Sequence, residues 1–173
     1  MSAITAISLI ALTIIGEARM QPPEGQACLA WTIRNRMDRS GWSAEAVAFQ
    51  QWQYLIWERD VVAPDYGLRL RWLTCEAWGQ FPDNPWCMEP VLTIGSSEYW
   101  WRTWSLAAMV YFGTGSPPEG CEGVENYDNL AAFWDGKDPP WVADYEVAAV
   151  YGDHTFYRPK EQLEKIRPFA YYR

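Results

Sequence analysis

The chain has 173 residues, of which 49% are hydrophobic and 21% charged, so it has the size and composition of one globular domain and not those of a disordered or low-complexity protein. Its 14 Lys and Arg stand against 22 Asp and Glu, which gives a net charge of -8. This sign is wrong for a protein that neutralises phosphate backbones, so we expect no nucleic-acid partner.

The N-terminal apolar run predicts a buried helix. Residues 3–15 are nearly all apolar, and no Lys or Arg precedes them, so we recognise no signal peptide. The run is also shorter than the ~20 residues that a membrane span needs. We therefore expect no membrane span, and instead a helix that is capped by Ser2 and buried on nearly all faces.

Two prolines end the first helix and begin the second. Pro22-Pro23, with Glu24 in the first turn, is typical of a helix N-terminus, and Ser40-Gly41 predicts where this helix stops. The helical spacing i, i+3, i+4, i+7 predicts one buried face, made of Ala27, Ala30, Trp31, Arg34 and Met37.

The next segment predicts two more helices and a loop. Ser43 is the expected N-cap of a third helix that continues to Ile56. Residues 65–78 predict a further helix, and residues 82–90, which contain Asn-Pro, predict a loop.

A long aromatic helix and a long loop follow. Ser96 or Ser97 is the expected cap of this helix, and Gly113 or Gly115 is its expected end. Residues 116–140 are rich in Gly, Pro, Asp and Asn and have little periodicity. Loops of this length within a compact domain are usually functional or disordered.

The C-terminal part predicts a small β-hairpin. Residues 146–150 and 155–158 have strand character and flank a Gly152-Asp153 turn. The chain contains no repeats and no interdomain linker. The sequence therefore predicts an α+β fold: a single, mostly helical domain over residues 1–173 with this hairpin near its end.

Histidine and cysteine usage limits metal and redox chemistry. His154 is the only histidine, and zinc hydrolases need two or three, so we expect neither a metal nor another cofactor. No C-x-x-C motif is present. Two disulfides in any of three connectivities, or free buried thiols, are both compatible with the spacing of the four cysteines, Cys28, Cys75, Cys87 and Cys121.

Several short blocks occur in a fixed order over nearly the whole chain. They are Gly16-Glu17-Ala18-Arg19, Pro23-Glu24-Gly25-Gln26, Ala30-Trp31-Thr32-Ile33-Arg34-Asn35-Arg36, Phe49-Gln50-Gln51-Trp52, Pro139-Pro140-Trp141 and Gly152-Asp153-His154-Thr155-Phe156-Tyr157-Arg158. Together they resemble the cell wall hydrolase family that includes spore cortex-lytic enzymes and many phage endolysins. Two positions depart from the family pattern: Met20 replaces a usual Gly, and Asn126-Tyr127-Asp128-Asn129 stands in place of a His-Tyr-His-like motif.

The resemblance implies a fold, an activity and a setting. It implies a lysozyme- or transglycosylase-like fold and cleavage of the peptidoglycan glycan strand between N-acetylmuramic acid and N-acetylglucosamine. The essential glutamate of the family falls on Glu17. We expect a monomeric phage endolysin that waits in the host cytoplasm until its release and then acts on the cell wall in the periplasm.

The chemistry requires a carboxyl group that keeps its proton near neutral pH. Glu17 follows an apolar run and lies where the first helix is expected to end, so desolvation and the helix dipole both oppose its ionisation. A lytic transglycosylase needs only this glutamate, because the muramic acid 6-hydroxyl closes onto the sugar. A hydrolytic muramidase needs a second carboxylate, for which Glu125 and Asp128 are the candidates.

The remaining candidate residues are polar or aromatic groups suited to sugars. Gln26, Asn35 and Arg36 lie on a helix where a solvated surface position is the ordinary expectation, and the amides of Gln26 and Asn35 also match N-acetyl groups. The other candidates for substrate binding are Trp52, Asn126, Tyr127, Asp128, Trp141 and His154. Core packing for the tryptophans, a structural role for the histidine, and a non-catalytic glycan-binding or virion structural protein remain open alternatives.

Overall fold

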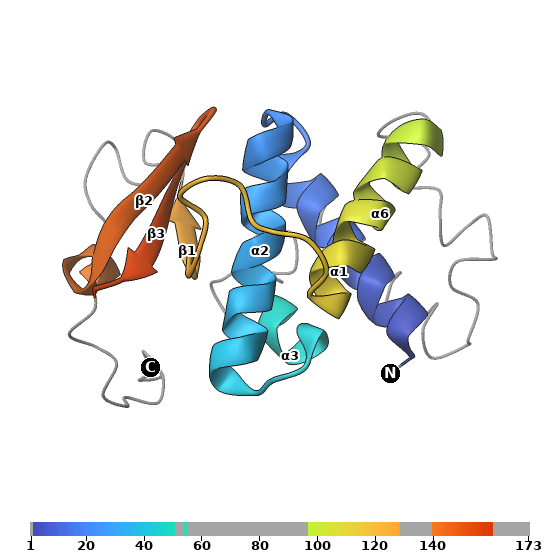
Figure 1. The fold of residues 1–173 in the computed structure, drawn as a ribbon, viewed down its shortest axis with the longest axis horizontal. Coiled ribbons are helices and arrows are strands. Elements are labelled where there is room, and N and C mark those ends of the chain that lie inside the picture. Colours follow the sequence, from blue (N-terminus) through green and yellow to red (C-terminus); the bar gives the residue numbers. More distant parts are fainter. Residues whose placement is uncertain (1, 51–53, 55–96, 129–139, 161–173) are drawn as a thin grey trace.

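A computed structural model describes residues 2–50, 54, 97–128 and 140–160 (Figure 1). In chain order its elements are the helices α1 (Ala3–Ala18), α2 (Pro23–Ser40), α3 (Ala44–Ala48) and α6 (Ser97–Phe112), the strand β1 (Asn126–Asp128), a 3-10 helix (Pro140–Asp144), and the strands β2 (Tyr145–Tyr151) and β3 (His154–Pro159). These helices and the small antiparallel sheet confirm the α+β class.

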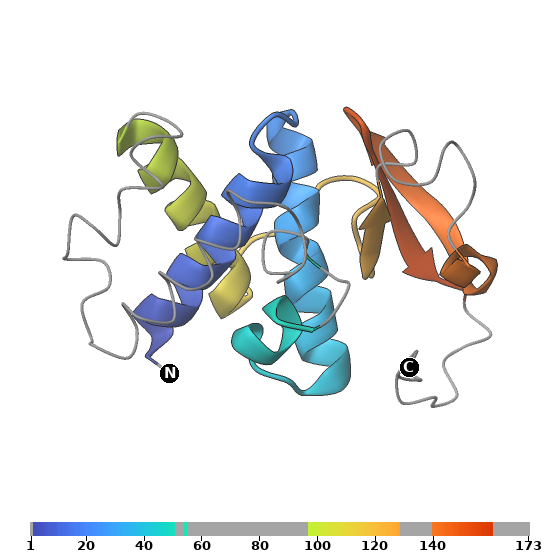
Figure 2. The same ribbon diagram turned by 180° about the vertical axis from the view of Figure 1, so that it is seen from behind.

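Helix α1 forms the centre of the helical layer. The Ser2 hydroxyl accepts a hydrogen bond from the Thr5 backbone at 3.2 Å, which is the expected cap. Every residue from 5 to 15 is buried, and both α2 and α6 pack against the helix, with α6 crossing it (Figures 1 and 2). The helix continues past the apolar run to Ala18, so Glu17 lies in its last turn. None of the helices in the described ranges combines the length and the apolar character needed to cross a bilayer.

Helix α2 begins and ends as predicted but buries more than one face. It starts at Pro23, and Gly41 at its C-cap has the left-handed φ of 70°. The fully buried residues include Leu29, Thr32, Ile33 and Arg36, whereas the predicted Arg34 retains 25% of its side-chain exposure. The prediction of a single face is therefore wrong in part. Its physical cause is the position of α2 between the other helices and the sheet (Figure 1).

The third and the aromatic helices have their predicted starts. The Ser43 hydroxyl accepts a bond from the Ala46 backbone at 3.2 Å and caps α3, which ends at Ala48 and not at Ile56. Helix α6 ends before Gly113, which has a φ of 66°. The predicted helix over residues 65–78 and the loop over 82–90 lie outside the described residues.

The sheet has the strand order β1-β3-β2 and lies beyond α2, on the side away from α1 and α6 (Figures 1 and 2). Strands β2 and β3 confirm the predicted hairpin. Strand β1 falls within the segment predicted as a loop. It pairs antiparallel with β3, with Tyr127 opposite Phe156, so its conformation depends on a partner distant in sequence.

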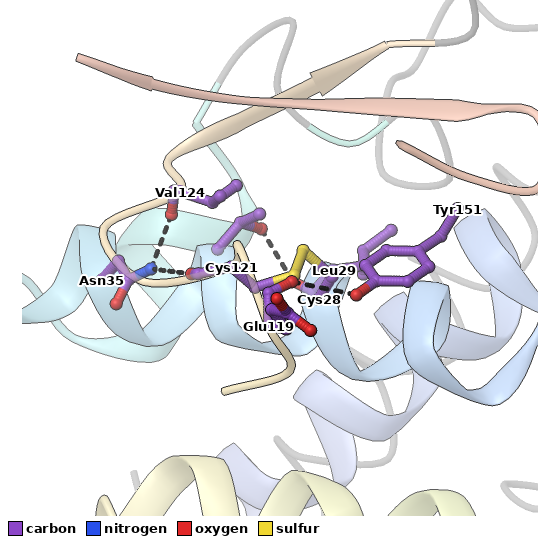
Figure 3. Close-up of a disulfide and its surroundings, with 8 residues drawn as sticks. Cys28, Leu29, Asn35, Glu119, Cys121, Val124 and Tyr151 are labelled. Atoms are coloured by element: carbon purple, nitrogen blue, oxygen red, sulfur yellow. Dashed lines mark hydrogen bonds between the residues drawn. A yellow bond between two sulfur atoms is a disulfide. The ribbon is translucent and has the colours of Figure 1, made fainter. Parts of the chain in front are cut away.

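A disulfide joins α2 to the segment that leads into β1. Cys28 and Cys121 are bonded across a sequence separation of 93 residues, and both are 0% exposed. The alternative of free thiols is therefore wrong for these two residues, whereas Cys75 and Cys87 lie outside the described residues. The Asn35 amide donates to the Val124 carbonyl at 2.7 Å beside this bridge (Figure 3), so the segment is held at two points.

The turn of the hairpin packs against the turn between α1 and α2. The Asp153 backbone N–H donates to the Gln21 side-chain oxygen at 3.0 Å. Gly152 has a φ of +59°, and a Cβ atom there would lie 2.1 Å from that oxygen and 2.9 Å from Cδ of Pro22. The hairpin therefore approaches the end of α1 as closely as a glycine allows.

We expect Gly152→Ala to lower the free energy of unfolding more than Gly123→Ala does. Both glycines have a left-handed φ, which costs alanine about 1–2 kcal/mol. A Cβ at Gly123 meets no described atom within 4 Å, whereas at Gly152 the steric clash adds roughly 1–3 kcal/mol. Urea unfolding of the two variants measures the difference. Equal losses would contradict the close packing of the hairpin turn.

Candidate active site

The end of α1 and the strand β1 bring two predicted site residues together. Glu17 lies in the last turn of α1, and its side chain is half-buried. The Tyr127 hydroxyl donates a hydrogen bond to Glu17 Oε2 at 2.8 Å across 110 residues of sequence. One carboxyl oxygen is thus held by a neutral donor, which orients the group.

Aromatic rings surround the Tyr127 side chain. Its ring centroid lies 6.0 Å from that of Tyr54, 6.1 Å from that of Phe156 and 5.2 Å from that of His154. Burial raises the pKa of Tyr127 well above its ordinary value, and the charge of Glu17 acts in the same direction. Tyr127 therefore remains protonated and remains a hydrogen-bond donor over the whole pH range in which a carboxyl group titrates.

Opposing influences act on the protonation of Glu17. The bond from Tyr127 stabilises the ionised carboxylate, because a charged acceptor bonds more strongly than a neutral one. Partial burial and the negative end of the α1 dipole stabilise the neutral acid instead, the dipole by ~0.3–1 kcal/mol. The arrangement suits a carboxyl group that passes a proton back and forth.

Behind Tyr127, two arginines of α2 hold the start of β1. Arg36 is only 4% exposed, so the expectation of a solvated Arg36 is wrong. It donates to the Glu125 backbone carbonyl and to the Asn126 side-chain oxygen. Arg39 forms an ion pair with the Glu125 carboxylate. Burial raises the pKa of Glu125, and the charge of Arg39 opposes this shift. Both predicted residues, Glu125 and Asn126, are thus engaged by α2.

The predicted sugar platform Trp141 lies on the other face of the sheet. Its ring packs edge-on against Tyr157 at 5.1 Å and against Tyr145 at 5.6 Å. Tyr157 follows Phe156 in β3, and successive residues of a strand face opposite sides. Trp141 is therefore not brought to the face where Tyr127 meets Glu17. Asp128, next to Tyr127 in β1, is buried with 8% exposure.

The two candidate amides, those of Gln26 and Asn35, donate hydrogen bonds to backbone carbonyls of segments next to the site. The buried Gln26 side chain donates to the Gln21 carbonyl at 2.9 Å and closes the turn that follows α1. The amide of Asn35 holds the segment that leads into β1, through Val124. Both side chains thus hold the backbone around the site through their amide N–H groups. Trp52 lies outside the described residues.

His154 packs behind the tyrosine. It is 6% exposed, and burial lowers the pKa of its ring below the ordinary value, although the charge of Asp153 acts in the opposite direction. Its Nδ1 has no hydrogen-bond partner among the described residues. The contact with the Tyr127 ring at 5.2 Å gives His154 a place in the wall around Tyr127.

Sequence reasoning missed the parts of the site that depend on packing. Tyr54 packs on Tyr127, and its hydroxyl lies 3.1 Å from the Thr32 hydroxyl. The i, i+4 spacing of Thr32 and Arg36 was the one available signal, because it puts both on one face of α2. Over the described stretches, no group of three His, Cys, Asp or Glu side chains that could hold a metal ion is found.

Three of the ordered sequence blocks supply residues around Tyr127. Glu17 from the first block and His154 with Phe156 from the last contact its side chain. Arg36, from the block in α2, contacts the two residues that precede it. Comparisons with protein-family models, with curated proteins and with solved structures found no match to this chain.

Proposed function

We propose that the chain is a peptidoglycan-degrading enzyme of lysozyme- or transglycosylase-like fold, a phage endolysin that cleaves the β-1,4 bond between N-acetylmuramic acid and N-acetylglucosamine. Glu17 is its general acid and base, and the reaction is that of a lytic transglycosylase. The observation that carries the proposal is the hydrogen bond from the hydroxyl of the half-buried Tyr127 to the half-buried Glu17 carboxyl at the end of α1.

The first step is protonation of the leaving group. The hydrogen bond from Tyr127 orients the carboxyl group of Glu17, which carries the proton. Glu17 donates this proton to the glycosidic oxygen as the bond from that oxygen to C1 of the muramic acid breaks. The carboxylate that results is stabilised by the Tyr127 donor, because a hydrogen bond to a charged acceptor is worth ~1.5–3 kcal/mol.

The second step returns the proton. The muramic acid 6-hydroxyl lies on the same sugar ring, so its attack on C1 is intramolecular and favoured by proximity. Glu17 accepts the hydroxyl proton as the new C1–O6 bond forms, which regenerates the acid and gives a 1,6-anhydro sugar. Glu125 supports this one-glutamate route, because its carboxylate is already paired with Arg39.

Product analysis tests the proposal. Purified peptidoglycan is digested with the protein, and the soluble fragments are analysed by mass spectrometry. We expect fragments that end in 1,6-anhydro-muramic acid. Fragments that end in reducing muramic acid would instead indicate a hydrolytic muramidase that uses a second carboxylate. Freed stem peptides, or intact glycan strands, would contradict glycan cleavage by this chain.

We expect Tyr127→Phe to move the alkaline limb of the pH profile of kcat/KM to higher pH. Activity falls as Glu17 ionises, and the phenol of Tyr127 favours the ionised form, so its removal delays ionisation. The loss of one hydrogen bond to a charged group corresponds to a displacement of about one to two pH units. Rates of glycan cleavage measured across the pH range give the limb.

Tyr151→Phe is the matched control for this substitution. The Tyr151 hydroxyl donates to the Glu119 carbonyl at 2.9 Å, so its removal deletes a tyrosine hydrogen bond that does not involve Glu17. We expect the wild-type pH profile from this variant. An alkaline limb that is the same in Tyr127→Phe as in the wild type would mean that Tyr127 does not act on the ionising group.

A further inference from the structure

We infer that Arg36 is a positioning residue for this site: its guanidinium fixes the start of β1, so that the Tyr127 hydroxyl meets the Glu17 carboxyl. The geometric part of the inference stands on contacts within the structure. Its catalytic consequence rests on the proposed function.

Arg36 grips the two residues that immediately precede Tyr127. Its Nε donates to the backbone carbonyl of Glu125, and its Nη2 donates to the side-chain oxygen of Asn126. The planar guanidinium presents these donors in a fixed relative geometry. The backbone is therefore fixed two residues before Tyr127, and a side chain is fixed one residue before it. Together these contacts leave the tyrosine little freedom of direction.

Arg36 also acts on the second tyrosine that supports the site. Its guanidinium carbon lies 5.9 Å from the centroid of the Tyr54 ring, within the range of a cation–π contact. Tyr54 in turn packs against Tyr127 at 6.0 Å and is tied to Thr32 of α2. The same side chain thus contacts the start of β1 and the ring that packs on Tyr127.

The burial of Arg36 argues for a role beyond stability. The side chain is 4% exposed, and its Nη1 has no hydrogen-bond partner among the described residues. Burying a charge with one donor unsatisfied is costly, and apolar side chains of similar volume often stabilise a core better. A residue kept at this cost is explained by the geometry that it imposes on β1.

Three variants test the inference: Arg36→Gln, Arg36→Lys and the control Arg34→Gln. Arg34 is matched to Arg36, because it lies on the same helix and also donates to a distant backbone carbonyl, that of Tyr111 at 2.8 Å. Two quantities are measured in each folded variant. One is the titration of the Glu17 carboxyl, followed by carbon-13 NMR, and the other is kcat and KM for peptidoglycan cleavage.

In Arg36→Gln we expect kcat to fall by on the order of 10- to 100-fold with little change in KM, because a displaced Tyr127 no longer holds the acid in place. We expect the Glu17 titration to move to higher pH, in the direction expected for Tyr127→Phe. Arg36→Lys keeps the charge but offers a single ammonium for two acceptors, so its values should lie between those of Arg36→Gln and the wild type. Arg34→Gln should retain the wild-type titration and kcat.

Wild-type kcat and Glu17 titration in Arg36→Gln would overturn the inference. If that variant does not fold, Arg36→Lys decides, and wild-type values there would overturn it equally. If the wild-type protein cleaves no glycan, the proposed function fails. The positioning role of Arg36 is still tested in that case, because the Glu17 titration can be measured without activity.

Discussion

Glu17→Gln is expected to lower the rate of peptidoglycan cleavage by about 10²- to 10⁴-fold, the range that a general acid or base contributes. Glutamine has nearly the same shape as glutamate, and its amide oxygen still accepts the hydrogen bond from Tyr127. It has no proton to give to the glycosidic oxygen and no carboxylate to take one back. The release of soluble fragments from purified cell walls measures the rate.

Glu24→Gln is the matched control for this variant. Glu24 lies in the first turn of α2 and is exposed, so its neutralisation changes the net charge equally without touching the site. We expect Glu24→Gln to cleave at the wild-type rate and both variants to unfold at the wild-type temperature. A Glu17→Gln protein of wild-type activity would contradict the mechanism. It would favour a different catalytic residue.

The double variant Cys28→Ala/Cys121→Ala is expected to lose about 4–5 kcal/mol of unfolding free energy, because the disulfide closes a long loop in the unfolded chain. The expected loss of stability is large because the two cysteines are 93 residues apart in the sequence. The bridge also anchors the segment that leads into β1, so glycan cleavage should fall together with stability (Figure 3). Urea unfolding measures the first effect, and fragment release measures the second.

Reduction of the wild-type protein provides the control for the cysteine variant. Chemical reduction followed by thiol blocking under unfolding conditions should lower stability to a similar degree without a change of sequence. Unchanged stability in both samples would contradict the structural role of the bridge. Because a reducing cytoplasm keeps thiols reduced, the proposed endolysin should gain this stability only after it reaches an oxidising compartment.

Local signals in the sequence predicted the elements whose ends are determined by neighbouring residues. Ser2 and Ser43 cap their helices, Pro23 begins α2, and Gly41 ends it. Each of these residues acts within one turn of the chain, so its effect can be recognised without the fold. The hairpin around Gly152 was predicted for the same reason.

Interactions between distant segments were beyond sequence reasoning. Strand β1 is three residues long and exists because it pairs with β3, so no alternation of polar and apolar residues marks it. A charged residue such as Arg36 is ordinarily assigned to the surface, and its burial depends on acceptors some 90 residues away. The sequence blocks predicted Glu17 as the acid, whereas its hydrogen bond to Tyr127 required coordinates.

The protonation of Glu17 tests the central claim most directly. The carboxyl carbon of each glutamate is followed by NMR as the pH is raised, and the Glu17 signal is assigned by its loss in Glu17→Gln. The account predicts that the Glu17 titration coincides with the alkaline limb of the kcat/KM profile and moves to higher pH together with it in Tyr127→Phe. A Glu17 titration that lies apart from this limb, or that stays in place in Tyr127→Phe, would contradict a general acid at this position.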